Sequence, residues 1–466
     1  MKKVSKILFI AVAAAFLLIP MLSTNIKTNQ VSEIDNRQLQ EFPAFQINGF
    51  RSGIDKYVSD RIGFRSEMIT AYQKFCDFAF HELVHPAYIY GKNNYIMAPD
   101  LTTYQHLDVN EEYVENYTDY LQSLDGFCRN RGIEFLFYLC PNKETIYPEY
   151  MPDGYNVMEQ PNRSDRILEK LAEKGVKYLF PKEMFLALKK DEQLYNVKYD
   201  AGHWNETGSF YGHQQIIHHL NERFPKMGEL EREEFEITQV QENTLPVSHF
   251  EIDEMVPHYE LVNTDAVQDE DIYEQVIVTS PNQYHRRFKN EIARQNGAPT
   301  VLIFGDSYFR LGSIFYLNHC AELVMLHAEN MPNAEYYISV FQPDIVIYEV
   351  VERQLASGWD AFKATKRYYN LNELQDNRKE ITAIEPISID IDMAVLRTQA
   401  EGQEVVSFSG SLDQQINTEN IQCFVAVLNN KEYYPVFDKT TLSYTFSFRA
   451  EDIEKGSMIS FFLLRE

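Results

Sequence analysis

Two short segments of the chain carry the residue types of a serine-based acyl-transfer site. In one of them, Gly305-Asp306-Ser307 follows directly after the apolar run 301–304. This pattern is typical of the carboxyl end of a buried strand, where ligands bind in open α/β sheets. A helix pattern begins at Tyr308, so backbone N–H groups beside the serine would be placed to hold an oxyanion. We therefore predict that Ser307 is a nucleophile that attacks an acyl carbon.

A serine hydroxyl becomes a strong nucleophile only when a base removes its proton. Asp200 and His203 supply such a base, because they lie three positions apart in a loop that precedes an amphipathic helix. In this arrangement the Asp200 carboxylate orients the imidazole while the other ring nitrogen reaches Ser307. A histidine near a helix start is more often structural, so the prediction depends on the pairing with the serine segment.

The sequence predicts neither a metal site nor a disulfide framework. Five cysteines are spread along the chain without paired C-x-x-C spacing. His213, His218 and His219 lie on the predicted helix after the Asp200 loop, and no carboxylates stand at ligand spacing beside them. We expect them to be surface histidines.

The elements that must position the two segments alternate between strand and helix patterns, which indicates a parallel α/β fold. Strands are predicted at 135–140, 176–180, 300–304, 322–326 and 345–351, and helices at about 110–131, 166–174, 182–190, 205–223, 308–318 and 333–341. Two shorter helical patterns, 54–59 and 67–80, come earlier. Residues 229–298 look irregular and strongly acidic, and their charge runs are most simply explained as solvated surface.

The pattern changes beyond about residue 380 to short alternating stretches separated by turn residues such as Asn429-Asn430. Such spacing suggests a small antiparallel β-sandwich. We therefore expect a leader at 1–30, a catalytic domain at 31–380 with an acidic insertion at about 229–298, and a sandwich at 381–466.

The first residues of the sequence have the pattern of an export signal. Lys2, Lys3 and Lys6 precede an apolar run without charges at 7–22. The length of this run lies between that of a cleaved signal peptide and that of a spanning helix. The rest of the chain is thus expected outside the cytoplasm, either secreted or anchored to the membrane.

The net charge of −26 argues against a protein that coats nucleic acid. A uniformly polyanionic acceptor would also be repelled. We therefore expect a neutral or cationic glycan, or else a localised basic groove that includes His285-Arg286-Arg287.

Taken together, the two segments resemble the SGNH (GDSL-type) hydrolase superfamily, and more closely its alginate O-acetylation (AlgX/AlgJ-like) and DHHW groups. Further matches are Asp35-Asn-Arg37, Asp60-Arg61, Phe64-Arg65, Tyr90-Gly-Lys92, Pro141-Asn-Lys143, Tyr147-Pro148, Met151-Pro152, Pro343-Asp344 and Glu352-Arg353. Ordinary SGNH hydrolases place the serine segment first, whereas this chain has the reversed order of the alginate-type relatives. These relatives commonly carry one residue between the aspartate and the histidine, and this chain has two.

The resemblance implies a flavodoxin-like sheet flanked by helices and an extracytoplasmic O-acetyltransferase that works through an acyl-serine on a cell-surface polysaccharide. It implies a membrane-bound O-acyltransferase as the acetyl donor, and no metal or cofactor is required. Asn142, at the end of a predicted strand, is a candidate oxyanion donor. Lys143, Tyr147 and Arg353 either line the cleft or hold its loops.

Two other functions remain open at this point: a carbohydrate esterase of the same fold, and a non-catalytic glycan-binding or assembly factor. The C-terminal sandwich is expected either to bind glycan or to serve as a packing module.

Overall fold

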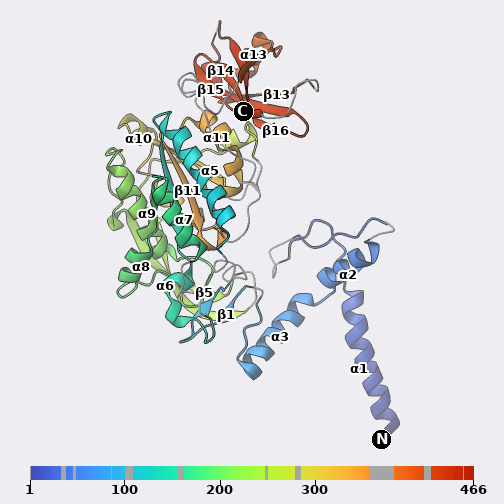
Figure 1. Ribbon diagram of the computed structural model, residues 1–466. Helices are drawn as coiled ribbons and strands as arrows, with labels where there is room; N and C mark the ends of the chain where they lie inside the picture. The colour runs from blue at the N-terminus through green and yellow to red at the C-terminus, as the bar shows by residue number, and fades with distance from the viewer. Residues whose placement is uncertain are drawn as a thin grey trace.

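The computed structural model describes residues 2–32, 38–45, 49–85, 87–99, 109–155, 162–246, 250–278, 285–355, 383–413, 421–454 and 456–465 (Figure 1). At its centre these residues form a seven-stranded sheet of order β4-β3-β11-β9-β10-β8-β7. The strands are β3 (Glu134–Cys140), β4 (Tyr178–Leu179), β7 (Val267–Gln268), β8 (Arg286–Lys289), β9 (Thr300–Gly305), β10 (Glu322–His327) and β11 (Ile345–Val351). Neighbours from β4 to β10 are parallel, whereas β8 and β7 add to that edge in antiparallel pairing.

Helices cover both faces of this sheet, which explains why its central strands are almost wholly apolar. One core joins α5 (Glu111–Arg129), α7 (Arg163–Glu173) and α11 (Ala334–Phe341) to one face of β3, β9, β10 and β11. A second core joins α8 (Lys182–Leu188) and α9 (Glu206–Asn221) to the opposite face. The predicted α/β fold with a helix-flanked sheet is confirmed, with a mixed edge that the sequence pattern did not indicate.

The prediction of a helix at 308–318 is wrong. The chain instead forms two short 3-10 turns, η5 (Phe309–Leu311) and η6 (Ser313–Phe315), on either side of Gly312. A Cβ atom at Gly312 would lie only 2.2 Å from His213 Nε2, so the backbone passes directly against that ring. His213 is itself fully buried rather than on the surface as expected, and burial lowers its pKa to about 3.

The segment predicted to be irregular contains regular structure. β5 (Phe235–Thr244) and β6 (Glu251–Leu261) pair as a long antiparallel ribbon, and β8 extends the central sheet. Short elements elsewhere are β1 (Ile89–Tyr90), β2 (Ile96–Met97), α6 (Lys143–Ile146) and α10 (Glu291–Gln295).

The N-terminal region contains three helices, α1 (Lys2–Leu22), α2 (Phe50–Arg61) and α3 (Arg65–Phe80). In Figure 1 α1 and α2 lie away from the α/β body, whereas Lys74 of α3 pairs with Glu251 of β6 at 2.8 Å. The buried Arg61 side chain ties this region together by donating to the backbone carbonyls of Lys27 and Gln40. Among the residues described, no helix has both the length and the apolar character needed for a membrane span. The Asp35-Asn-Arg37 match lies outside the described residues.

The predicted C-terminal antiparallel sheets are present and enclose a separate apolar core. One sheet has the order β12-β18-β14-β15 and the other β13-β17-β16. Their elements are β12 (Ala383–Ile387), α13 (Met393–Ala400), β13 (Val405–Ser411), β14 (Ile421–Leu428), β15 (Lys431–Tyr433), β16 (Val436–Asp438), β17 (Ser443–Arg449) and β18 (Ile459–Arg465). The boundary predicted near residue 380 lies outside the described residues.

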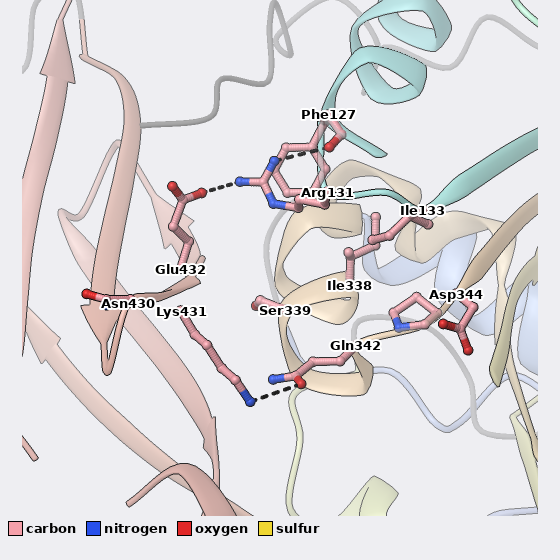
Figure 2. Close-up of a pocket in the computed structure, with 11 residues that line it drawn as sticks. Phe127, Arg131, Ile133, Ile338, Ser339, Gln342, Asp344, Asn430, Lys431 and Glu432 are labelled. Carbon is pink, nitrogen blue, oxygen red and sulfur yellow. Dashed lines mark hydrogen bonds and ion pairs between the residues drawn. The ribbon is translucent and has the colours of Figure 1, made fainter. Parts of the chain in front are cut away.

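A cavity of about 450 Å³ separates parts of the α/β body from the C-terminal sheets. Figure 2 shows Arg131 pointing across it to Glu432, and Lys431 pointing to Gln342. Asp344 also lines the cavity and directly precedes β11. The C-terminal sheets therefore dock at the amino ends of the parallel strands.

A second set of ion pairs crosses the same interface. Glu404 accepts hydrogen bonds from Arg287 Nη2 at 2.7 Å and Lys289 Nζ at 2.5 Å. Burial alone would raise the pKa of Glu404, but the hydrogen bonds and charges of these two partners lower it to about 2.

Because this carboxylate is more acidic in the folded protein, its contribution to stability is full above the unfolded pKa of about 4.3 and is lost as the pH falls toward 2. We expect Glu404→Gln to lower the melting temperature at pH 7, and the difference from wild type to shrink progressively below pH ~4.3. Differential scanning fluorimetry across this pH range measures the difference in melting temperature. Glu401→Gln, an exposed neighbour, is the control, and a difference that does not depend on pH would contradict the assignment.

Candidate active site

The three residues predicted to form a triad meet at the carboxyl edge of the central sheet. Ser307 stands two residues after the end of β9, and its Oγ lies 2.8 Å from His203 Nε2. On the other side of the ring, His203 Nδ1 lies 2.7 Å from Asp200 Oδ1. Since a carboxylate can only accept, Nδ1 carries the proton and Nε2 is left to accept from the serine hydroxyl.

The unusual spacing of Asp200 and His203 is accommodated by the backbone. Asp200 has a φ of +45°, in the left-handed region that aspartate tolerates better than most residues. The His203 N–H then donates to the Asp200 carbonyl at 3.1 Å, which closes a tight turn. This turn brings the carboxylate back onto the ring despite the extra residue between them.

The charge state of Asp200 suits its position at the end of the series of hydrogen bonds that runs through His203 to Ser307. Burial alone would raise the pKa of Asp200, but the charge of His203 and its hydrogen bond hold that pKa below the ordinary value, with help from Arg310 and Arg353. The carboxylate is therefore ionised at neutral pH and can stabilise a positive charge on the imidazole.

Asp306 holds the nucleophile turn and takes no part in the triad. Its Oδ1 accepts from the Tyr308 N–H at 2.9 Å, and its Oδ2 accepts from the Val351 N–H at 2.8 Å. Trp204, next to His203, donates from Nε1 to the Tyr308 carbonyl at 3.2 Å. The turn is thus tied both to β11 and to the histidine loop.

The backbone that leads to Asp200 is held from two sides. Glu254, on β6, accepts from the N–H groups of Val197, Lys198 and Tyr199 at 2.6, 2.8 and 2.6 Å. Lys143 donates to the carbonyls of Ile96, Asn196 and Val197 at 2.7, 2.6 and 3.2 Å. We name residues 196–199 with these two side chains the loop clamp.

Lys143 therefore holds a loop, which is one of the two roles expected for it. Its side chain is buried, and burial lowers its pKa to about 7. Tyr147 is buried as well, and its hydroxyl accepts from the Leu194 N–H at 3.3 Å. Both side chains are therefore buried and in contact with neighbouring loops.

Arg353 connects the Asn142 side chain with the backbone at Gly202 and with the Tyr308 side chain. Arg353 Nη1 donates to the Gly202 carbonyl at 2.7 Å and lies 3.4 Å from Asn142 Oδ1 and from the Tyr308 hydroxyl. Because the guanidinium can only donate, it fixes the oxygen of the Asn142 amide and leaves Nδ2 as a donor. Among the described residues no acceptor for Asn142 Nδ2 is found, so this donor is left without a partner in the protein.

Sequence reasoning missed Glu254. It lies in the stretch 229–298, which was predicted to be irregular, and only its register on β6 brings the carboxylate to the Asp200 loop. No local signal distinguishes it from the other acids of that strand.

A family model matches residues 101–313 of the chain. Its description is "SGNH hydrolase-like domain, acetyltransferase AlgX". The predicted resemblance is confirmed. The matched segment contains Asn142, Asp200, His203 and Ser307. No curated protein matches the chain.

Solved structures with similarity to the chain include three from different organisms. Bacillus cereus PatB1 with a sulfonyl adduct has 17% identity and a TM-score of 0.44, covering 59% of this chain and 97% of its own. A DHHW family protein from Eubacterium siraeum has 14% identity and a TM-score of 0.39, covering 54% and 89%. Pseudomonas aeruginosa AlgX has 12% identity and a TM-score of 0.40, covering 85% and 98%.

Because Glu254 belongs to the loop clamp, we predict that its substitution affects catalysis although it is not a member of the triad. In Glu254→Gln the neutral amide holds the three N–H groups less strongly, and we expect kcat with p-nitrophenyl acetate to fall about tenfold to a hundredfold with little change in KM. Stopped-flow assays measure this, and melting temperature monitors folding. Glu251→Gln, on the same strand but exposed, is the control. A Glu254 variant with unchanged kcat would remove its positioning role.

Asn142 gives a second prediction. Asn142→Ala removes the Nδ2 donor but keeps the backbone N–H that binds Glu352 Oε2 at 2.8 Å. If Nδ2 stabilises the oxyanion, the acylation rate should fall about 10²–10³-fold. Pre-steady-state release of p-nitrophenol reports that rate, and a fall of less than about threefold would exclude the assignment.

Proposed function

We propose that the protein is an O-acetyltransferase that moves acetyl groups onto hydroxyls of a polysaccharide through an acyl-serine intermediate. The observation that carries this proposal is the continuous set of hydrogen bonds from Asp200 through His203 to Ser307. The family description "acetyltransferase AlgX" supports the type of group transferred.

In the first half of the reaction, Ser307 Oγ attacks the acetyl carbonyl of the donor while His203 Nε2 takes the hydroxyl proton. The carbonyl oxygen becomes an oxyanion, to which Asn142 Nδ2 would donate. When the carbonyl re-forms, the bond to the leaving group breaks, and that group takes the proton from His203. Ser307 is then an acetyl ester.

In the second half, a sugar hydroxyl attacks the acetyl-serine carbon and His203 Nε2 takes its proton. The bond to Ser307 Oγ breaks, and the serine recovers its proton from His203. The products are the acetylated glycan and the free enzyme, so no cofactor enters the balance. Water in place of the sugar would give hydrolysis, which is the esterase alternative.

We further propose that this reaction takes place outside the cytoplasm with acetyl supplied by a membrane-bound O-acyltransferase. The support for the location is the pattern of Lys2, Lys3 and Lys6 before an uncharged apolar run. Support for the donor is the resemblance to the alginate-type acetylation systems.

The proposal is tested by incubating the protein with p-nitrophenyl acetate, with and without oligosaccharides, followed by mass spectrometry. We expect an acetyl group on Ser307 in the wild-type protein and none in Ser307→Ala. When oligosaccharide is added as the acceptor, we expect the acetyl group to pass from Ser307 to it. His203→Gln should lower acylation at least about a thousandfold. His218→Gln, an exposed histidine on α9, is the matched control and should behave as wild type.

Two results would change the proposal. Acyl-serine that reacts only with water across the acceptor panel would make the protein an esterase. Absence of acylation, together with glycan binding, would make it a binding or assembly factor.

A further inference from the structure

One helix of the N-terminal region presents an apolar side to solvent. Met68, Tyr72, Phe75 and Phe78 of α3 recur at every third or fourth position, so they lie on one side of the helix. Their exposed fractions are 38, 58, 57 and 91%. We name these four residues the apolar stripe.

The other side of α3 is polar and faces the chain that follows the helix. Gln73 is buried, and its Nε2 donates to the Val84 carbonyl at 2.9 Å. Asp77 accepts from the hydroxyl of Tyr90, on β1, at 2.7 Å. A helix on the surface of a soluble domain normally turns its apolar side to the core, so α3 has the reverse arrangement. An exposed apolar surface of this kind marks an interaction site.

The beginning of α3 adjoins the end of α1. The Gly63 N–H donates to the Pro20 carbonyl at 3.0 Å. α1 carries the uncharged apolar run 7–22, and its side chains are exposed as well, with 74% for Phe9 and 76% for Phe16. Two exposed apolar surfaces therefore start from one junction.

The composition of the apolar stripe favours a lipid bilayer as its occupant. None of the four side chains carries a charge. Aromatic side chains are enriched where a bilayer meets water, and a helix with one apolar side lies in that interface with this side buried about 5–10 Å deep. α3 has 16 residues and is about 24 Å long at 1.5 Å per residue, so it can extend along such a surface. The adjoining run 7–22 is the segment expected to reach the same bilayer.

We propose that the apolar stripe of α3 lies in the headgroup region of a lipid bilayer, beside the end of α1, and holds the α/β body at the membrane surface. This inference rests on the proposed location outside the cytoplasm. It adds a membrane contact that lies beyond the leader predicted at 1–30 and therefore does not depend on retention of that leader.

The same contact would orient the active site. Lys74 of α3 pairs with Glu251 of β6 at 2.8 Å, and β6 is the strand that contributes to the loop clamp. Leu83, shortly after α3, belongs to one apolar cluster with Ala201, which follows Asp200 directly. α3 is thus joined to the side of the domain that carries the triad. A bilayer at the apolar stripe would bring this side close to an acetyl donor in the membrane.

A tryptophan in the apolar stripe tests the contact in the full chain. Phe78→Trp is reconstituted in phosphatidylcholine vesicles, with the wild-type fluorescence as the baseline. We expect its emission to shift to shorter wavelength and to be quenched by lipids with brominated acyl chains. Because the stripe is uncharged, this quenching should persist at high salt. Val395→Trp, 51% exposed on α13, is the matched control and should show neither effect.

A charge in the apolar stripe should remove the contact. Ala71, exposed on α3 beside Tyr72, is changed to Glu in the Phe78→Trp background, and we expect the quenching to be lost. Ala172→Glu, at an exposed position on α7, is the control and should leave the quenching unchanged. Melting temperature monitors folding in each variant.

Three results would overturn the proposal. The first is a Phe78→Trp chain whose emission does not respond to vesicles, and the second is quenching that survives Ala71→Glu. The third is emission that is already shifted without vesicles, together with a dimer that Ala71→Glu dissociates in analytical ultracentrifugation. That result would assign the stripe to a second copy of the chain.

The fluorescence readout separates this inference from the proposed function, because it needs no acyl chemistry. Ser307→Ala in the Phe78→Trp background should be quenched as strongly as the chain with Ser307. If no acyl-serine forms but quenching occurs, acetyl transfer fails and the membrane contact stands. If acyl-serine forms without quenching, the membrane contact fails alone.

Discussion

The hydrogen bond between Ser307 and His203 is the contact on which the rest of the site depends. It joins residues 104 positions apart across 2.8 Å, so neither local sequence nor a single element can maintain it. Asp306 fixes the serine turn to β11, and Trp204 fixes the histidine loop to the same turn. A shift of about 1 Å at this contact would be costly, because reacting groups must be held in a near-attack geometry.

Beneath the triad, burial separates the carboxyl groups by charge state. Burial raises the pKa of Glu349 well above its ordinary value, and raises the pKa of Glu144 and of Glu352 to about 7. The pKa of Asp200 is lowered instead, chiefly because His203 opposes the effect of burial. The pKa values of these carboxyl groups therefore move in opposite directions: Asp200 beside the imidazole loses its proton more readily, whereas Glu144, Glu349 and Glu352 hold theirs more tightly.

The sequence was informative where chemistry and local pattern coincide. An apolar strand that ends in Gly305-Asp306-Ser307 is recognisable because a buried strand, a turn and a nucleophile follow one another along the chain. Asp200 and His203 were recognisable because the residues are close in sequence.

What the sequence could not provide are contacts set by tertiary packing. The helix pattern at 308–318 is overridden because the backbone at Gly312 packs against the buried His213. Glu254 reaches the Asp200 loop only through the register of the β5–β6 ribbon, and Lys143 becomes a loop anchor only because its charge is enclosed by carbonyl groups. From the sequence, Lys143 could equally line the cleft or hold its loops, and Glu254 carried no signal of its own.

The two ends of the central sheet have separate tasks. Ser307 and Asn142 lie at the carboxyl ends of the strands. The C-terminal sheets dock at the amino ends, near Asp344, and Figure 1 shows these sheets beyond one end of the central sheet. β11 alone has seven residues and spans about 23 Å at 3.3 Å per residue. A glycan held by the C-terminal sheets would therefore have to extend along the side of the domain to reach the serine.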